Sequence, residues 1–215
     1  MALNKAQTKQ LWGALLAIIL LLIFDQTSKV LVKTNMQLYE SIEIFSWFKI
    51  YFVENGGMAF GIELVATYIL TIFRIIVVCW FGVLIVKIIK RGTFRLGFII
   101  CLSLILAGAL GNIIDCAFYG VLFTHSYGQV AQFLPGEGYA TLLNGRVVDM
   151  LSFPLIRTTW PSWTPFWGGQ ELVFFRPIFN IADSAICVNV FILLFCYKHS
   201  FGAVFFEKDN HTNDE

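Results

Sequence analysis

The segment Phe179-Asn180-Ile181-Ala182-Asp183 stands at the start of the last apolar run of the chain, Ser184 to Tyr197. Upstream, Val147-Val148-Asp149-Met150 places a second carboxylate in an equally apolar setting. Inserting an ionised aspartate into a membrane helix costs roughly 2.5–3.5 kcal/mol, so an aspartate at membrane depth is a functional candidate. We expect Asp149 and Asp183 to lie close together and to share one proton.

The composition is that of an integral membrane protein. Of the 215 residues, 58% are hydrophobic and only 13% are charged, whereas soluble domains average about a quarter charged residues. The net charge of +1 and the absence of a large basic cluster argue against binding to nucleic acid. The five cysteines are scattered without paired spacing, which argues against a disulfide framework or a zinc site.

Four apolar runs predict four transmembrane helices, because a helix needs roughly 20 residues to span a bilayer. We expect a single membrane domain covering residues 1–215, with external segments at 33–63 and 116–178, the second of them irregular. Residues 45–53 are rich in aromatic and β-branched residues and lead into the turn signal Asn55-Gly56-Gly57, so they predict a small external sheet. The predicted helices are 11–32, 64–86, 96–114 and 180–197.

The lysines and arginines predict the orientation in the membrane. The N-terminus, the loop 87–95 and the C-terminus hold eight of the fifteen basic residues in short segments. Basic residues accumulate in short cytoplasmic loops. We therefore expect both termini to be cytoplasmic.

Four aspartates converge on the outer level of this topology. Asp25 lies fourteen residues along a helix that runs outward from Leu11, and Asp115 directly follows a second outward helix. Asp183 is near the outer start of a helix that runs inward, and Asp149 lies in the external segment before it. Two neighbouring carboxylates cannot both ionise cheaply, so one keeps a proton. One then acts as general base toward water and the other as general acid toward a carbonyl. Taken singly, Asp149 or Asp183 also suits a helix cap.

Other polar residues allow two interpretations. Asp25 and Lys29 have i,i+4 spacing, which suits a structural ion pair as well as a substrate contact. Asn55, Asn112 and Asn180 each flank an apolar run and bond either turns of the backbone or the amides of a bound peptide. A proton-coupled transporter that uses the acids as a relay is the alternative function, although the chain lacks the internal repeats typical of such proteins.

Five short motifs occur in an order that resembles the lipoprotein signal peptidases (signal peptidase II), a bacterial peptidase family. The first two are Asp25-Gln26-x-x-Lys29 and Asn55-Gly56-Gly57-Met58-Ala59-Phe60. The third runs from Gly108 to Asp115, with Gly111 inside it. The last two are Gly145-Arg146-Val147-Val148-Asp149 and Phe179-Asn180-Ile181-Ala182-Asp183.

The resemblance implies an all-α membrane protein of four transmembrane helices, with a small β-sheet cradle and a short helix on the outer face. It implies an aspartyl endopeptidase of the bacterial inner membrane that removes the signal peptide from diacylglyceryl-modified prolipoproteins, just before the lipid-bearing cysteine. The active site would face the periplasm, and the enzyme would need no metal or cofactor. Membrane lipid and the prolipoprotein are the expected partners, and we expect a monomer. The implied catalytic pair is Asp149 and Asp183, and the expected substrate-binding or site-organising residues are Asp25, Lys29, Asn55, Gly111, Asn112, Asp115, Arg146, Asn180 and Ala182.

The chain departs from the family pattern at one position. The family usually has an arginine directly after the aspartate of its third motif, and here that position is Cys116. We expect Arg146 to supply the missing guanidinium. The outer segment 154–177 is also long, and its tryptophans suit the membrane interface.

Overall fold

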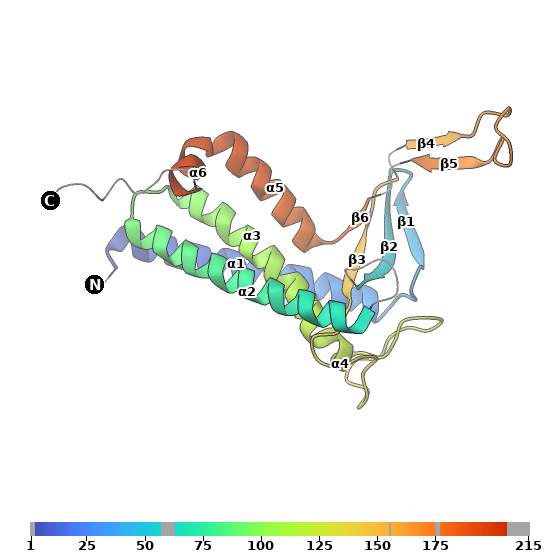
Figure 1. The fold of residues 1–215 in the computed structure, drawn as a ribbon, viewed down its shortest axis with the longest axis horizontal. Coiled ribbons are helices and arrows are strands. Elements are labelled where there is room, and N and C mark those ends of the chain that lie inside the picture. The colour runs from blue at the N-terminus through green and yellow to red at the C-terminus, as the bar shows by residue number, and fades with distance from the viewer. Residues whose placement is uncertain (1–2, 57–62, 155, 175–176, 206–215) are drawn as a thin grey trace. The chain divides into compact units, whose positions relative to one another are not determined.

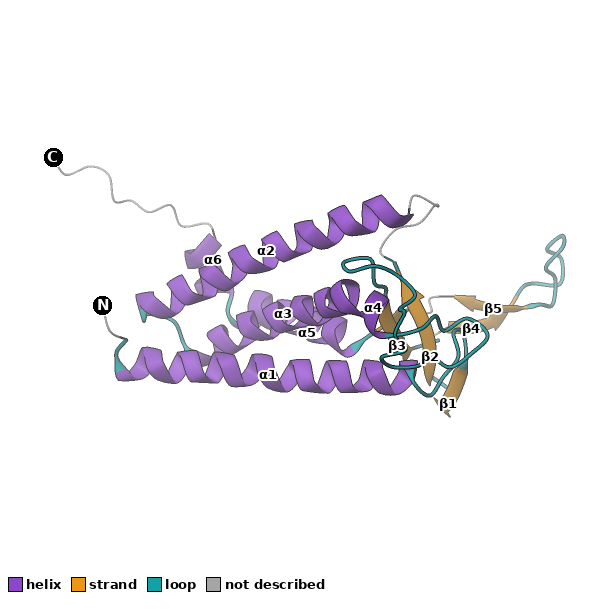
Figure 2. Ribbon diagram, turned by 90° about the horizontal axis from the view of Figure 1, so that it is seen from below, coloured by secondary structure: helices purple, strands orange, loops and turns teal. Residues whose placement is uncertain are grey.

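The long apolar runs of the sequence form helices. The computed structural model describes residues 3–56, 63–154, 156–174 and 177–205, which are mostly helical and carry two small antiparallel sheets (Figures 1 and 2). The chain divides into two units. The helical unit comprises Met1–Phe24, Phe73–Gly111 and Ala182–Glu215, and the sheet unit comprises Asp25–Ile72 and Asn112–Ile181.

The helices coincide with the predicted membrane segments. In the described part of the chain, three stretches are long and apolar enough to cross a bilayer, namely Lys5–Lys33, Thr67–Arg91 and Leu96–Leu122. The helix pair Ile181–Cys196 and Lys198–Val204 is also apolar but bends by 97°, which is the geometry of a broken span or of a re-entrant loop. The expectation of an apolar helical membrane protein is therefore confirmed. The helices are α1 (Lys5–Lys33), α2 (Glu63–Arg91), α3 (Leu96–Ile114), α5 (Ile181–Cys196) and α6 (Lys198–Phe205).

Helix α3 does not stop at Ile114. It continues through one π-helical turn, Asp115–Tyr119, and then through the short helix α4 (Gly120–Leu122). Within the expected external segment 116–178, residues 116–122 are the helical residues that the structure describes. A π-helical turn inserts an extra residue into the helical ladder and is frequent at functional sites. Here it carries Asp115.

The predicted small sheet is present and has four strands in the order β1-β2-β3-β6 (Figure 1). The strands β1 (Ser41–Phe45) and β2 (Phe48–Asn55) come from the segment expected to form strands. The strands β3 (Val147–Ser152) and β6 (Ile178–Phe179) come from the segment 116–178, which was expected to be irregular. That segment also holds a separate hairpin of β4 (Ile156–Thr159) and β5 (Glu171–Phe174). These strands were not predicted because their partners are distant in the sequence or because the strands are very short.

Strand β2 carries a bulge opposite the segment that contains Asp149. Ile50 pairs with Leu151, whereas the next pair is Val53 with Asp149, so β2 holds one extra residue between the two pairs. Bulges bend a strand and re-aim its side chains, and they are frequent beside active sites. Beyond the bulge, Asn55 pairs with Val147.

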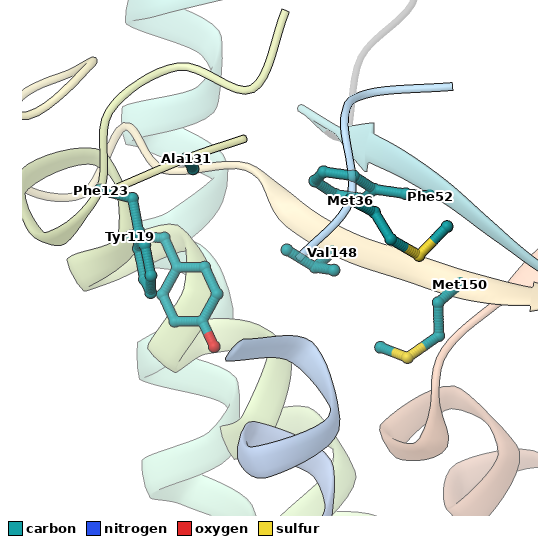
Figure 3. Close-up of a cluster of buried hydrophobic side chains, with 7 residues drawn as sticks. All are labelled: Met36, Phe52, Tyr119, Phe123, Ala131, Val148 and Met150. Carbon is teal, nitrogen blue, oxygen red and sulfur yellow. The ribbon is translucent and has the colours of Figure 1, made fainter. Parts of the chain in front are cut away.

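A buried hydrophobic cluster packs the sheet against the segment 115–123, which is helical up to Leu122. Phe52 from β2 and Val148 from β3 are fully buried, and the rings of Tyr119 and Phe123 lie 4.8 Å apart (Figure 3). Alternate residues of a strand face opposite sides of the sheet. Val148 and Met150 therefore face this cluster, and Asp149 faces the other side. The cluster consists of Met36, Phe52, Tyr119, Phe123, Ala131, Val148 and Met150.

In the helical unit, a glycine lets α3 approach the start of α5 closely. A Cβ atom placed on Gly108 would lie 2.5 Å from the carbonyl oxygen of Ala182 and 2.7 Å from Cγ1 of Ile186. Small residues permit such close backbone contact between membrane helices. Gly108 therefore fixes the position of the first turn of α5 against α3.

We predict that Phe52→Ala will strongly destabilise the protein. Removing a fully buried phenylalanine leaves a cavity, and such changes cost about 3–5 kcal/mol. The thermal unfolding midpoint of the purified protein in detergent measures the effect. Phe45→Ala is the matched control because Phe45 is 55% exposed on the same sheet, and it should lower the midpoint much less. Equal shifts for both variants would show that the cluster does not stabilise the fold.

Candidate active site

The buried ammonium group of Lys29 joins three acceptors in the sheet unit. Its Nζ lies 2.9 Å from Oδ2 of Asp25, one turn earlier on α1, and 2.8 Å from Oδ2 of Asp115 in the π-helical turn. It also donates to Oδ1 of Asn112 at 3.0 Å. The side chains of Lys29, Asp25 and Asp115 are at most 1% exposed. The predicted i,i+4 pair of Asp25 and Lys29 is therefore part of a larger buried network.

Gln26 closes this network. Its Nε2 donates to Oδ2 of Asp25 at 3.1 Å and to Oδ1 of Asp115 at 2.9 Å. Its Oε1 accepts a hydrogen bond from the hydroxyl of Tyr119 at 3.1 Å. Both carboxylates thus receive an amide donor in addition to the ammonium. Buried charges are tolerated only when they are paired and hydrogen-bonded in this way.

The network reaches Asp149 by two routes. Oδ2 of Asp115 accepts the backbone N–H of Val148, next to Asp149, at 3.2 Å. The amide of Asn180 donates both to Oδ1 of Asn112 at 3.1 Å and to Oδ1 of Asp149 at 2.8 Å. Asn180 is fully buried and Asp149 is 6% exposed. The carboxylate of Asp149 is therefore held by Asn180, from the chain just before α5, and Asn180 is itself bonded to Asn112 of α3.

A second amide contacts the other oxygen of Asp149. Asn55, at the end of β2, directs its Nδ2 to Oδ2 of Asp149 at 3.5 Å. Asn180, just before α5, thus contacts Oδ1 of Asp149, and Asn55, at the end of β2, contacts Oδ2. Amide donors stabilise an ionised carboxylate more than a protonated one.

Three of the predicted site residues, Gly111, Ala182 and Asp183, lie in the helical unit. Asp183 is in the first turn of α5, and Ala182 before it is fully buried. Gly111 lies on α3, three residues after Gly108. Because Asp149 belongs to the sheet unit and Asp183 to the helical unit, the pairing of the two carboxylates stays a prediction.

Arg146 and Cys116 occupy different surroundings. The side chain of Arg146 is exposed, and its backbone N–H donates to the hydroxyl oxygen of Tyr139 at 2.7 Å. Cys116 is buried in the π-helical turn. The role of Arg146 as a replacement for the family arginine stays a prediction.

Gln26 and Tyr119 are site residues that the sequence prediction missed. Gln26 follows Asp25 directly in the first motif, so its position was a signal that motif analysis left unused. Tyr119 lies in an apolar segment and gave no such signal.

Most of the chain matches one family model. The model is described as "Signal peptidase (SPase) II" and matches residues 17–198. The chain belongs to the signal peptidase II family. A lipoprotein signal peptidase of Porphyromonas gingivalis is 53% identical over 184 residues, which cover 85% of this chain and 81% of that protein. A lipoprotein signal peptidase of Amoebophilus asiaticus is 34% identical over 194 residues, and the match covers 87% of this chain and 78% of that protein.

The fold is also that of a solved bacterial membrane enzyme. A structure determined by the in meso method at 2.3 Å resolution has a TM-score of 0.53 and 24% sequence identity, and the match covers 91% of this chain and 93% of that chain. As a signal peptidase II family member with several apolar helices, the protein is a bacterial inner-membrane protease. Family membership favours a peptidase over the proton-coupled transporter.

We predict that Lys29→Gln will destabilise the protein by about 3–5 kcal/mol, because it leaves two buried carboxylates without their cation. The unfolding midpoint in detergent measures the loss. Lys49→Gln is the matched control, since Lys49 forms a more exposed ion pair with Glu43 at 2.6 Å, and such pairs contribute roughly 0–1 kcal/mol. The idea of a buried charge network would be wrong if the control lowered the midpoint as much as Lys29→Gln.

Proposed function

We propose that the protein is an aspartyl endopeptidase that cleaves diacylglyceryl-modified prolipoproteins just before the lipid-bearing cysteine. The observation that carries this proposal is the fixed carboxylate of Asp149, held by Asn180 at 2.8 Å beside the buried Lys29 network in a signal peptidase II chain. The names of the curated relatives support lipoproteins as the substrate class. Asp183 is the proposed partner of Asp149.

The two carboxylates have different roles in this mechanism. The amide donors of Asn180 and Asn55 favour the ionised form of Asp149, so Asp149 is assigned as the general base and Asp183 as the general acid. Asp149 removes a proton from water while the water oxygen attacks the scissile carbonyl carbon. Asp183 gives its proton to the carbonyl oxygen, which produces a tetrahedral diol. The C–N bond then breaks as the proton held by Asp149 passes to the leaving nitrogen. Asp183 takes back a proton from one hydroxyl of the diol, which leaves a carboxylic acid and restores both aspartates to their starting states.

The membrane explains why the proposed reaction takes place near the outer ends of the helices. Water is scarce in the hydrocarbon core and available at the headgroup region, and the signal segment is apolar. The charge bias of eight basic residues in short segments supports cytoplasmic termini. The proposed active site then faces the periplasm, where the mature lipoprotein emerges.

We predict that Asp149→Asn and Asp183→Asn, made separately, will each lower the rate of prolipoprotein cleavage by at least about 100-fold, because each removes a proton-transfer group. The measurement is cleavage of a diacylglyceryl-modified precursor by purified enzyme in lipid nanodiscs. Asp209→Asn, in the C-terminal tail, is the control for an aspartate outside the pair and should retain activity. Wild-type cleavage by either Asp149→Asn or Asp183→Asn would refute the catalytic pair.

A further inference from the structure

A second buried lysine lies at the end of α1, one turn after Lys29. The side chain of Lys33 is fully buried, and its ammonium forms an ion pair with Oε1 of Glu54 in β2. The ammonium also donates to the hydroxyl oxygen of Ser126 at 3.0 Å, and Ser126 donates to Oε1 of Glu54 at 2.7 Å. None of these three residues belongs to the Lys29 network, and the proposed reaction does not use them.

A cage of three aromatic rings surrounds the ammonium of Lys33. The Nζ atom lies 5.9 Å from the ring centre of Phe52, 5.4 Å from that of Phe123 and 4.9 Å from that of Tyr139. A cation within about 6 Å of a ring face is attracted to it. The rings do not replace an anion, however, because a buried charge that loses its partner is strongly destabilising. Glu54 is therefore held firmly at Lys33.

Glu54 directly precedes Asn55, the residue whose amide contacts Asp149. Successive residues of a strand face opposite sides of the sheet. Glu54 is paired with Val148 and faces the hydrophobic cluster, as Val148 does. Asn55 faces the other side, where its Nδ2 approaches Oδ2 of Asp149 at 3.5 Å. The bond between Lys33 and Glu54 therefore fixes the end of β2 one residue away from an amide donor of Asp149.

The aromatic cage also contacts the start of β3. The hydroxyl oxygen of Tyr139 accepts the backbone N–H of Arg146 at 2.7 Å. Arg146 directly precedes Val147, the first residue of β3, and Val147 is the register partner of Asn55. Lys33 therefore contacts one residue that holds the end of β2 and another that holds the paired start of β3.

These contacts give Lys33 a role in the geometry of the proposed active site. We infer that Lys33 is a positioning residue: through Glu54 it holds the end of β2 so that the amide of Asn55 reaches the carboxylate of Asp149. Because the side chain of Lys33 is fully buried, it acts through these residues and not on the substrate. This inference rests on the proposed function, because it takes Asp149 to be a reacting group.

The test is a double-mutant cycle between Lys33 and Asn55. Lys33→Met removes the ammonium but keeps an unbranched side chain, and Asn55→Ala removes the amide. Each should lower kcat for a diacylglyceryl-modified precursor at least about tenfold, because a misplacement of about 1 Å at a reacting group can cost about 100-fold in rate. For Lys33→Met, KM should change much less than kcat, since no substrate contact is lost. The double variant should have the kcat of Asn55→Ala, because residues that act through one another are not additive.

Further variants keep the test decisive if Lys33→Met folds poorly. Ser126→Ala removes one hydrogen bond to Glu54 and takes the place of Lys33→Met in the cycle, with a smaller loss of kcat. Lys33→Arg keeps the cation and should retain more of the wild-type kcat than Lys33→Met. Lys49→Gln is the matched control, since it removes a lysine of the same strand that pairs with Glu43 instead, and it should leave kcat unchanged. Each variant is assayed below its own unfolding midpoint.

Two results would overturn the inference. One is a folded Lys33→Met enzyme, or a Ser126→Ala enzyme in its place, with the wild-type kcat. The other is a double variant in which the two losses multiply. In that case Lys33 would stabilise the protein without acting through Asn55.

Hydrogen exchange separates this inference from the proposed function, because it requires no cleavage. Mass spectrometry of the full-length protein in nanodiscs measures exchange of the backbone amides of residues 52–56. Exchange there should be faster in Lys33→Met, whereas residues 96–106 of α3 should exchange as in the wild type, since local openings are distinct from global unfolding. This pattern supports the positioning of Asn55 even if Asp149→Asn still cleaves. Unchanged exchange at 52–56 contradicts the inference even if both aspartates prove essential.

Discussion

The structure depends on one buried ammonium group, that of Lys29. It neutralises Asp25 and Asp115, which are 90 positions apart in the sequence, in a place where neither is more than 1% exposed. Two carboxylates this close would otherwise repel each other in a poorly solvated setting. The ion pairs therefore tie the end of α1 to the π-helical turn after α3. The sheet is joined to the same point, because Asp115 also accepts the backbone N–H of Val148.

From this point, hydrogen bonds rather than ion pairs lead to Asp149. Asn112 accepts from both Lys29 and Asn180, and Asn180 in turn donates to Asp149. Side-chain amides transmit position without adding charge, so Asn180 and Asn55 are neutral groups that contact Asp149 near a strongly charged cluster. Family membership and this geometry together make a peptidase site the simplest account of the buried polar residues.

The sequence predicted the helices well and the strands only in part. Apolar runs near 20 residues long are distinctive, although α1 begins earlier and α2 ends later than predicted. The sequence did not predict the π-helical turn after α3 or the bend after α5. Strand β3 was missed because Val147–Met150 is a short apolar run that periodicity cannot assign to helix or strand. Its partner, β2, is about 90 positions away. The motifs located most polar residues of the site, but they could not show that Gln26 bridges two acids or that Glu54 pairs with Lys33.

Strand β2 holds one extra residue between Ile50 and Val53. The number of residues in this strand therefore decides which of its side chains face Asp149. Side chains alternate between the two faces of a sheet, so loss of one residue there would exchange the directions of Glu54 and Asn55. An acid would then meet Asp149, and an amide would replace the counter-ion of Lys33. Divergent sequences of this fold are therefore constrained against single-residue deletions within this strand.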